Sequence, residues 1–260
     1  MQNITILVAT HKQYPMPGDK MYLPVFVGAQ NNPDEYQRLA ALGYAGDASG
    51  DNISLKNKSY CELTAVYWAW KNLSAEYIGL VHYRRHFRGR ASGSKQNRIL
   101  TCGEAEELLK DCNVLLPKKR RYFIETNRGQ YIHAHHAEGL VNTRKVIAAR
   151  CPEYLAAFDK VMDKTSGHRF NMFVMKSDVF GKYCEWLFGI LFDVEKTLDI
   201  SGWSPKEQRV YGYLAERLLD VWLLKNGVEY RDIPYMFMEK QNWAKKIADF
   251  LARKFGFEKK

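Results

Sequence analysis

The sequence of 260 residues lacks the marks of several common protein classes. Its five cysteines are scattered and no two have C-x-x-C spacing, so neither a zinc site nor a redox motif is predicted, and reduced thiols of a cytosolic protein are expected. No stretch approaches the run of about 18 apolar residues that a membrane-spanning helix needs. The first residues have no basic segment followed by a long apolar one, so no signal peptide is predicted. We therefore expect a soluble or peripheral protein that stays on the side of the membrane where it is made.

Several motifs of nucleotide and ester chemistry are also absent from the sequence. Neither G-x-x-x-x-G-K nor G-x-G-x-x-G occurs, which disfavours P-loop hydrolases and dinucleotide enzymes of the Rossmann type. G-x-S-x-G is missing, so the common hydrolase motif is not supported. The hydrophobic share of 46% and the charged share of 26% are ordinary for a globular protein, which excludes collagen-like, coiled-coil and disordered chains.

Positive charge is what the sequence has in excess. It contains 39 Lys and Arg against 29 Asp and Glu, a formal net charge of +10. Such a surplus indicates a polyanionic partner, which can be nucleic acid, anionic lipid or a phosphorylated small molecule. The aromatic share of 13% suits grooves for ring-shaped ligands, and it equally suits a well-packed core.

The hydrophobic runs predict an α/β protein. Strands are expected at 4–9, 22–29, 77–83, 113–116, 170–175 and 229–236, and helices at 58–72, 104–110, 133–149, 153–163, 177–198 and 206–225. Residues 31–52 are expected to be mostly loop, and Ser59 and Glu62 fit a capping box at the start of the helix 58–72. The order strand, strand, helix, strand in the first third predicts a parallel sheet.

Three clusters of cations follow predicted strands. They are Thr10 to Lys12, His82 to His86, and the basic run 118–121. Ligands of open α/β sheets bind beyond the carboxyl ends of the strands. Arg binds phosphate oxygens through two parallel hydrogen bonds and Lys acts as a point charge, so a diphosphate ligand is expected. The run 118–121 is equally well explained as a solvated basic loop.

Two further clusters of polar residues have more than one interpretation. His133, His135 and His136 are disfavoured as metal ligands, because adjacent histidines rarely converge on one ion without a nearby carboxylate or Cys and H-E-x-x-H is absent. They could contact phosphate or substrate hydroxyls, or only form the start of a helix. In the helix 206–225, one face carries Arg209, Gly212, Tyr213, Glu216 and Asp220.

Glu216 on that face is a candidate general base, and Tyr213 could pack on a substrate ring. Glu216 could instead pair with Arg217 or Arg209 in a solvated network.

The residues 241–260 are predicted to form a basic amphipathic helix. The segment from Lys245 to Lys260 contains six basic and only two acidic residues, and its apolar residues form a stripe at helical spacing. This stripe suits the headgroup region of anionic lipid, or it packs on the core of the protein itself.

Four segments together resemble one bacterial family. The segments 52–72 (NISLKNKSYCELTAVYWAWKN), 77–87 (YIGLVHYRRHF), 170–188 and 208–219 occur in the order typical of the family catalogued as domain of unknown function 4422. The family is associated with capsule, exopolysaccharide and O-antigen synthesis and is regarded as a set of glycosyltransferases, some of them galactofuranosyltransferases. The resemblance implies one domain at 1–240 with a GT-A-like (Rossmann-like) fold, a mixed, mostly parallel sheet flanked by helices with a helical C-terminal part, followed by the helix 241–260.

The resemblance also implies a reaction and a set of site residues. The expected reaction moves galactofuranose or another hexose from a UDP-sugar to a polyprenyl-diphosphate-linked glycan, with inversion and with Glu216 as the base. It is expected at the inner face of the bacterial cytoplasmic membrane, on which the C-terminal helix docks. The residues expected to bind the nucleotide sugar are Thr10, His11, Lys12, Asn57, Lys58, Glu62, His82, Tyr83, Arg84 and Arg85. The residues expected to bind the acceptor or substrate are His133, His135, Asn171, Met172, Arg209 and Tyr213.

No metal cofactor is expected to be required. Many GT-A enzymes hold a divalent metal with an Asp-x-Asp motif at the strand end that resembles 77–83, and this sequence has His82, Tyr83 and Arg84 there. The arginines would neutralise the diphosphate in place of the metal. The alternative function is a non-catalytic basic module that binds nucleic acid or another polyanion, which would spread its cations over one exposed face. Because the cations follow buried strands, we favour the enzyme and expect no nucleic acid partner.

Overall fold

The computed structural model describes residues 3–122 and 124–239. Its strands are β1 Ile4–Thr10, β2 Tyr22–Phe26, β3 Ala45–Gly46, β4 Tyr77–His82, β5 Arg85–Phe87, β6 Val114–Pro117, β7 Arg120–Arg121, β8 Ser166–Gly167, β9 Phe173–Lys176, β10 Arg231–Ile233 and β11 Tyr235–Phe237. Its α-helices are α1 Pro33–Ala40, α2 Asn57–Tyr60, α3 Leu63–Asn72, α4 Cys102–Leu109, α5 Asn127–Ala134, α6 Ala137–Arg150, α7 Leu155–Met162, α8 Ser177–Thr197 and α9 Val210–Asn226.

The described residues form a mixed, mostly parallel sheet with the strand order β10-β6-β9-β4-β1-β2-β3. Strand β4 lies at its centre, and the neighbouring β1 pairs in parallel with both β2 and β4. Strand β9 runs antiparallel to its two neighbours, β4 and β6. Strands β5 and β11 extend the sheet beyond the end of β4 as an antiparallel pair. The carboxyl ends of β1 and β4 therefore meet the amino end of β9 at one edge of the sheet.

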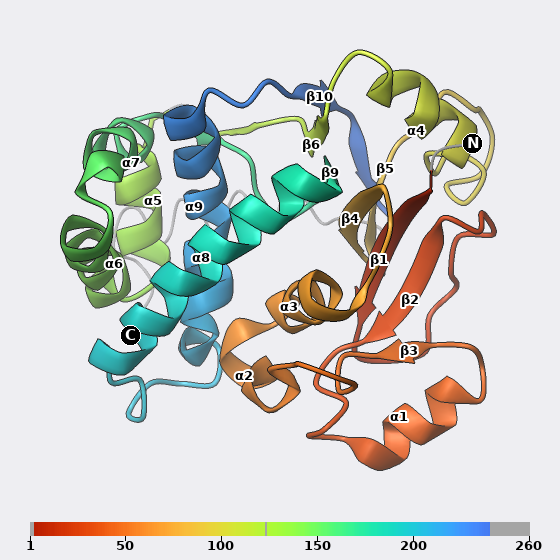
Figure 1. The fold of residues 1–260 in the computed structure, drawn as a ribbon, viewed down its shortest axis with the longest axis horizontal. Coiled ribbons are helices and arrows are strands. Elements are labelled where there is room, and N and C mark those ends of the chain that lie inside the picture. The colour runs from red at the N-terminus through yellow and green to blue at the C-terminus, as the bar shows by residue number, and fades with distance from the viewer. Residues whose placement is uncertain (1–2, 123, 240–260) are drawn as a thin grey trace.

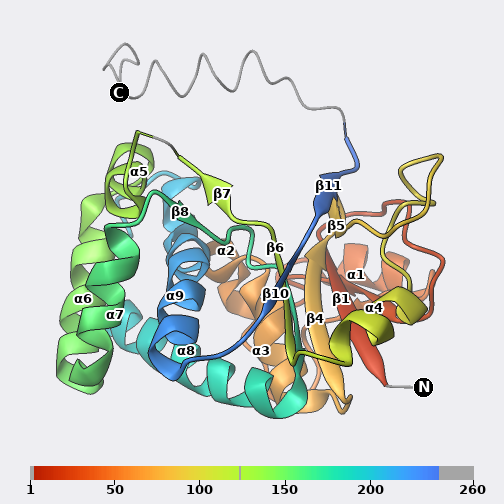
Figure 2. The ribbon, with the colours of Figure 1, turned by 90° about the horizontal axis from the view of Figure 1, so that it is seen from above.

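The two faces of the sheet bury two separate cores. Leu7 and Leu80 belong to the core that α3, α8 and α9 cover, whereas Val8 and Val81 point into the core beneath α4. This alternation follows from the period of two residues in a strand, and it explains why both strands read as continuous apolar runs. Helices α5, α6 and α7 stand at one end of the molecule, against α8 and α9 and away from β1, β2 and β3 (Figures 1 and 2). Together with α8 and α9 they make the C-terminal half of the described chain largely helical, as the sequence predicted.

The predicted helix 58–72 is wrong in one respect, because the structure divides it into α2 and α3 at Cys61. Cys61 has a φ of +54°, a conformation that residues other than Gly adopt rarely. The capping box of Ser59 and Glu62 is not formed. The Ser59 hydroxyl donates to the carbonyl of Lys56, and the Glu62 carboxylate accepts a hydrogen bond from Asn171 instead. A long-range partner thus replaces the local one.

Other predicted boundaries also moved for identifiable reasons. The strand predicted at 170–175 begins only at Phe173, because Phe170 and Asn171 have φ values of +76° and +52°. The helix predicted at 133–149 is two helices, α5 and α6, separated at residues 135–136. The segment 31–52 contains α1 and β3. No helix in the described part of the chain is long and apolar enough to cross a membrane. The predicted helix 241–260 lies outside the described residues.

Candidate active site

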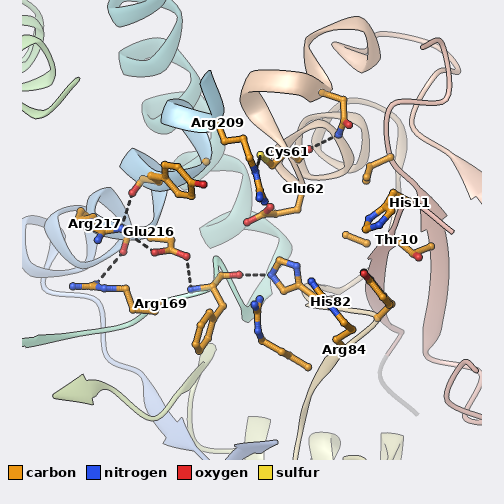
Figure 3. Close-up of a pocket in the computed structure, with 18 of the residues that line it drawn as sticks. Thr10, His11, Cys61, Glu62, His82, Arg84, Arg169, Arg209, Glu216 and Arg217 are labelled. Atoms are coloured by element: carbon orange, nitrogen blue, oxygen red, sulfur yellow. Dashed lines mark hydrogen bonds and ion pairs between the residues drawn. The ribbon is translucent and has the colours of Figure 1, made fainter. Parts of the chain in front are cut away.

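A cavity of about 570 Å³ opens at the edge where β1 and β4 end. Thr10 and His11 enter it from the end of β1, and His82 to Arg85 enter from the end of β4 (Figure 3). The amino end of α9 forms the opposite wall with Arg209, Tyr213 and Glu216. Segments far apart in the sequence thus meet in the position that the parallel strands predicted.

Most residues predicted to bind a nucleotide sugar line this cavity. They are Thr10, His11, Asn57, Lys58, Glu62, His82, Tyr83, Arg84 and Arg85. Lys12 does not line it, although its ammonium group lies 5.5 Å from the centre of the Tyr83 ring. Burial and the charge of Lys12 lower the pKa of His11, and burial lowers the pKa of His82. Both imidazoles are therefore expected to be neutral at pH 7.

The residues predicted to bind the acceptor divide into two groups. His135, Arg209 and Tyr213 line the cavity, and the His135 ring stacks on Tyr213 with 4.0 Å between ring centres. His133 does not line it and lies 2.8 Å from Glu125. Met172 is fully buried in the core beneath α4. Asn171 lies behind the wall, where its side-chain amide donates to Glu62 at 2.7 Å and to the carbonyl of Gly212.

Positive side chains dominate the cavity wall. Seven Lys and Arg residues line it against the two carboxylates of Glu62 and Glu216, and the seven are Lys58, Arg84, Arg85, Arg120, Arg169, Arg209 and Arg217. Two of these arginines follow β4 and two, Arg169 and Arg217, are at most 4% exposed. Charge of this kind in a concave site concentrates anions. The cavity is therefore suited to an anionic ligand.

The contacts of Arg85 leave its positive charge available to bind an anion. The guanidinium lies 4.4 Å from the centre of the Phe170 ring and 5.6 Å from that of Phe237. Its buried Nε has no hydrogen-bond partner, and Arg85 forms no ion pair with any described residue. Burial lowers its pKa, although an arginine stays charged at neutral pH. Arg84 differs, because its side chain is 46% exposed and lies 3.4 Å from Glu239.

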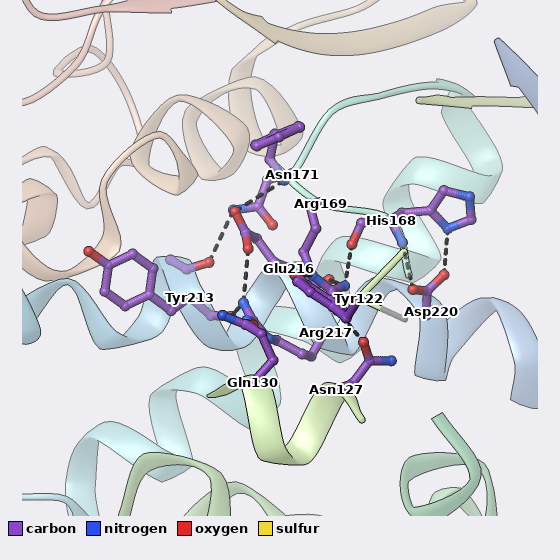
Figure 4. A network of polar contacts seen from close by, with 12 residues as sticks. Tyr122, Asn127, Gln130, His168, Arg169, Asn171, Tyr213, Glu216, Arg217 and Asp220 are labelled. Atoms are coloured by element: carbon purple, nitrogen blue, oxygen red, sulfur yellow. Dashed lines mark hydrogen bonds and ion pairs between the residues drawn. The ribbon is translucent and has the colours of Figure 1, made fainter. Parts of the chain in front are cut away.

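Glu216 lines the cavity, as a candidate general base should, and it is also ion-paired with Arg217, as the alternative interpretation predicted. One carboxylate oxygen accepts a hydrogen bond from the backbone N–H of Phe170 at 3.1 Å, and the other accepts from Arg217 at 2.9 Å (Figure 4). Asp220 is one turn further along α9 and does not line the cavity. It accepts hydrogen bonds from the backbone and the ring of His168 instead.

The turn at Phe170 and Asn171 connects the two sides of the cavity. The N–H of Phe170 contacts Glu216, its carbonyl accepts from Nε2 of His82, and Asn171 holds Glu62. Cys61, which also lines the cavity, is not a thiolate, because burial and the nearby charge of Glu62 raise the pKa of its thiol to about 11. No group of three or more His, Cys, Asp or Glu side chains in the described ranges is arranged to hold a metal ion.

Tyr122, Arg169 and Arg217 line this cavity although the sequence did not predict them there, whereas Arg120 belongs to the basic run 118–121, for which ligand binding and a solvated loop were both open. The prediction considered the carboxyl ends of strands, whereas Arg169 precedes a strand. Because β9 is antiparallel, its amino end lies at the same edge as the carboxyl end of β4. Arg169 lies between Gly167 and a buried strand, so it precedes its strand, whereas Arg84 and Arg85 follow theirs. Because the two strands run in opposite directions, both patterns place arginines at the same edge of the sheet.

Two comparisons with known proteins agree with this geometry. The model of the family described as domain of unknown function (DUF4422) matches residues 5–227. A solved apo structure described as the WbbM bifunctional glycosyltransferase superposes with a TM-score of 0.83 and is 29% identical, over 92% of this chain and 46% of that one. The chain thus spans less than half of that protein. A comparison with curated proteins found no match. The GT-A-like α/β fold predicted from the sequence is confirmed.

Proposed function

Because the chain belongs to the family described as domain of unknown function 4422, whose model matches residues 5–227, we propose that it is a glycosyltransferase that uses a UDP-sugar. The observation that carries the proposal is the pair Arg84 and Arg85 at the end of β4, in one cavity with the carboxylates of Glu62 and Glu216. The likeness to a bifunctional glycosyltransferase supports the reaction class. The sugar is galactofuranose or another hexose, and the acceptor is a polyprenyl-diphosphate-linked glycan of capsule, exopolysaccharide or O-antigen synthesis.

In the proposed reaction the base removes a proton from an acceptor hydroxyl, and the oxygen attacks the anomeric carbon of the donor sugar. The bond from that carbon to the β-phosphate oxygen breaks, and its electron pair leaves with UDP. Arg84 and Arg85 stabilise the charge that develops on the diphosphate, which is where fixed cations contribute most. Thr10, His11 and Tyr83 border the end of the cavity where the nucleotide is expected. One displacement of this kind inverts the anomeric configuration.

Glu216 is the proposed base. An ionised carboxylate has about four lone-pair positions, and the bonds from Phe170 and Arg217 use two of them. Each oxygen therefore keeps a lone pair for an acceptor hydroxyl while the two donors fix the direction of the carboxylate. Glu62 is the second carboxylate in the cavity, and it accepts a hydrogen bond from the side-chain amide of Asn171.

UDP binding and UDP release test the proposal. We expect isothermal titration to detect UDP binding at millimolar ligand or below, and one member of a panel of UDP-sugars to release UDP when a glycan acceptor is present. The alternative, a non-catalytic polyanion-binding module, predicts binding of oligonucleotides without a preference for UDP. No detectable UDP binding by the wild-type protein would reject the enzyme. The alternative is disfavoured because the cations described above line a cavity.

Activity is expected to persist without a divalent metal. The motive is the sequence His82, Tyr83 and Arg84 at the strand end, where cationic side chains can meet the diphosphate directly. Turnover measured in EDTA should remain within a few-fold of turnover in buffer with added manganese. Complete loss in EDTA with recovery on adding manganese would mean that a metal ligand has been overlooked.

Peripheral binding at the inner face of the cytoplasmic membrane also belongs to the proposal. It rests on the basic and apolar pattern of residues 241–260, which lie outside the described residues. Co-sedimentation with anionic vesicles should be strong for the full chain and weak for a chain that ends at Gln241. Equal binding of the two proteins would reject docking through this segment.

A further inference from the structure

The cavity holds more positive charge than a UDP-sugar can neutralise. Seven Lys and Arg side chains line it with two carboxylates, and Glu239 pairs with Arg84 from outside the lining, so four positive charges remain. A diphosphate diester carries about two negative charges, one for each phosphate. Uncompensated charge at low exposure is unfavourable, so such charge is normally retained for a bound anion or a fixed partner. The surplus therefore points to a second anionic group.

The surplus is concentrated away from the nucleotide residues. Arg120 comes from β7, Arg169 from the segment after β8, and Arg217 from α9. In Figure 3, Arg169 and Arg217 lie at the opposite side of the cavity from Thr10 and His11, with Arg84 and His82 between. We call these three arginines the Arg120 subsite.

Arg169 has no anionic hydrogen-bond partner although it is 4% exposed. Its guanidinium donates to the Tyr122 hydroxyl, the side-chain oxygen of Asn127 and the carbonyl oxygens of His168 and Glu216, which are all neutral acceptors (Figure 4). Four of its five N–H groups are used in this way, and one remains. These bonds hold the guanidinium in place without cancelling its charge, and the carboxylate of Asp220, which interacts electrostatically with Arg169, is itself hydrogen-bonded to His168.

Arg217 is only partly neutralised by Glu216. It is 2% exposed, and its Nε has no hydrogen-bond partner among the described residues. Arg169 and Arg217 both donate to Glu216, Arg169 to its carbonyl oxygen at 3.4 Å and Arg217 to its carboxylate at 2.9 Å, so the two guanidinium groups lie beside the same residue. Burial and the charge of Arg169 also lower the pKa of Arg217. An anion bound beside both groups would relieve the repulsion between them.

Arg120 completes the subsite from the solvent side. Its guanidinium lies 5.5 Å from the centre of the Tyr122 ring, and that of Arg169 lies 5.3 Å from the same centre. Arg120 is exposed and has no ion pair within the described part of the chain. Two guanidinium groups therefore lie near the Tyr122 ring at the rim of the cavity.

We propose that the Arg120 subsite binds a carboxylate or phosphate group of the acceptor, so that the acceptor glycan is anionic close to the reacting hydroxyl. The inference rests on the proposed function. Arg217 is bonded directly to Glu216, so a group held there lies next to the base. Binding the acceptor through this charge would orient its hydroxyl toward Glu216 and leave the donor end of the cavity to the UDP-sugar.

The test titrates UDP-saturated protein with three monosaccharide probes, so that the diphosphate site is already filled. The probes are methyl glucuronide, glucose 6-phosphate and uncharged methyl glucoside. Binding of each probe is measured from the chemical-shift changes of the protein. We expect the better anionic probe to bind at least about tenfold more tightly than the glucoside, as one or two charge-assisted hydrogen bonds provide. A preference for the glucuronide or for the phosphate identifies the anionic group.

Arg120→Ala should abolish most of this preference and leave UDP affinity unchanged. Arg121→Ala is the matched control, because Arg121 is the exposed neighbour on the same short strand and does not line the cavity. Equal binding of all three probes, or the same small effect of both variants, would overturn the inference. If the wild-type protein does not bind UDP, the proposed function fails separately, and the same probes without UDP still report on the Arg120 subsite.

Discussion

Glu216→Gln is expected to lower turnover by about 10²–10⁴-fold, which is the usual contribution of a general base. The loss should appear in kcat, and UDP affinity should change little, because Glu216 lies on the wall opposite the end of β1 (Figure 3). Gln has nearly the same shape and can still accept the hydrogen bond from the backbone of Phe170. It cannot take a proton from the acceptor.

The substitution also removes the counter-charge of Arg217, so a loss of folding must be measured separately. Thermal unfolding of Glu216→Gln with and without UDP provides that measurement, and Glu229→Gln is the control at an exposed carboxylate outside the cavity. A folded Glu216→Gln protein that binds UDP and turns over at a near-normal rate would assign the base to Glu62. The position of Glu216 would then serve only to hold Phe170 and Arg217.

Arg85→Ala is expected to weaken UDP binding by about 10–100-fold, since a hydrogen bond to a charged group contributes roughly 1.5–3 kcal/mol and about 1.4 kcal/mol is tenfold in affinity. Arg85 is largely buried and has no ion pair with the described residues, so its charge is free to meet the diphosphate. Arg84→Ala should weaken UDP binding by only a few-fold, because Arg84 is half-exposed and already lies near Glu239.

Two controls make this comparison specific. Arg88→Ala removes an exposed arginine just beyond β5 that does not line the cavity, and UDP affinity should not change. Arg85→Lys keeps the charge but loses the planar group that stacks on Phe170, so it should recover part of the affinity. Equal UDP affinities for the Ala variants of Arg84, Arg85 and Arg88 would show that the diphosphate does not bind at the end of β4.

The part of the cavity that is proposed to hold the donor could be predicted because its signal is local. Strands β1 and β4 are apolar runs that end in polar residues, and parallel strands bring such ends together whatever the rest of the chain does. The Arg120 subsite as a whole could not be predicted in this way, although Arg120 belongs to the basic run 118–121 that was one of the candidate clusters. Arg169 reaches the cavity only because β9 is antiparallel, and the direction of a short buried strand is set by its neighbours in the sheet.

Glu62 is a second residue whose partner in the structure could not be predicted from the sequence. Its spacing from Ser59 fits a local cap, yet in the structure the chain turns at Cys61 and the carboxylate is bonded to Asn171, 109 residues away. A pattern of four residues carries no information about a partner at that distance. Glu216 is a third case, since its helix face predicted that it would enter the cavity but not that Phe170 would fix its direction.

The turn at Phe170 and Asn171 has a consequence for attempts to change the specificity of the proposed transfer reaction. The backbone of Phe170 contacts His82 through its carbonyl, on the proposed donor side, and Glu216 through its N–H, on the proposed acceptor side, and the side chain of Asn171 holds Glu62. Selection for a new donor through changes at these two positions would therefore alter acceptor use in the same step, and the two specificities could not evolve independently there. Libraries aimed at the proposed acceptor alone belong at Arg120, whose guanidinium lies over the Tyr122 ring.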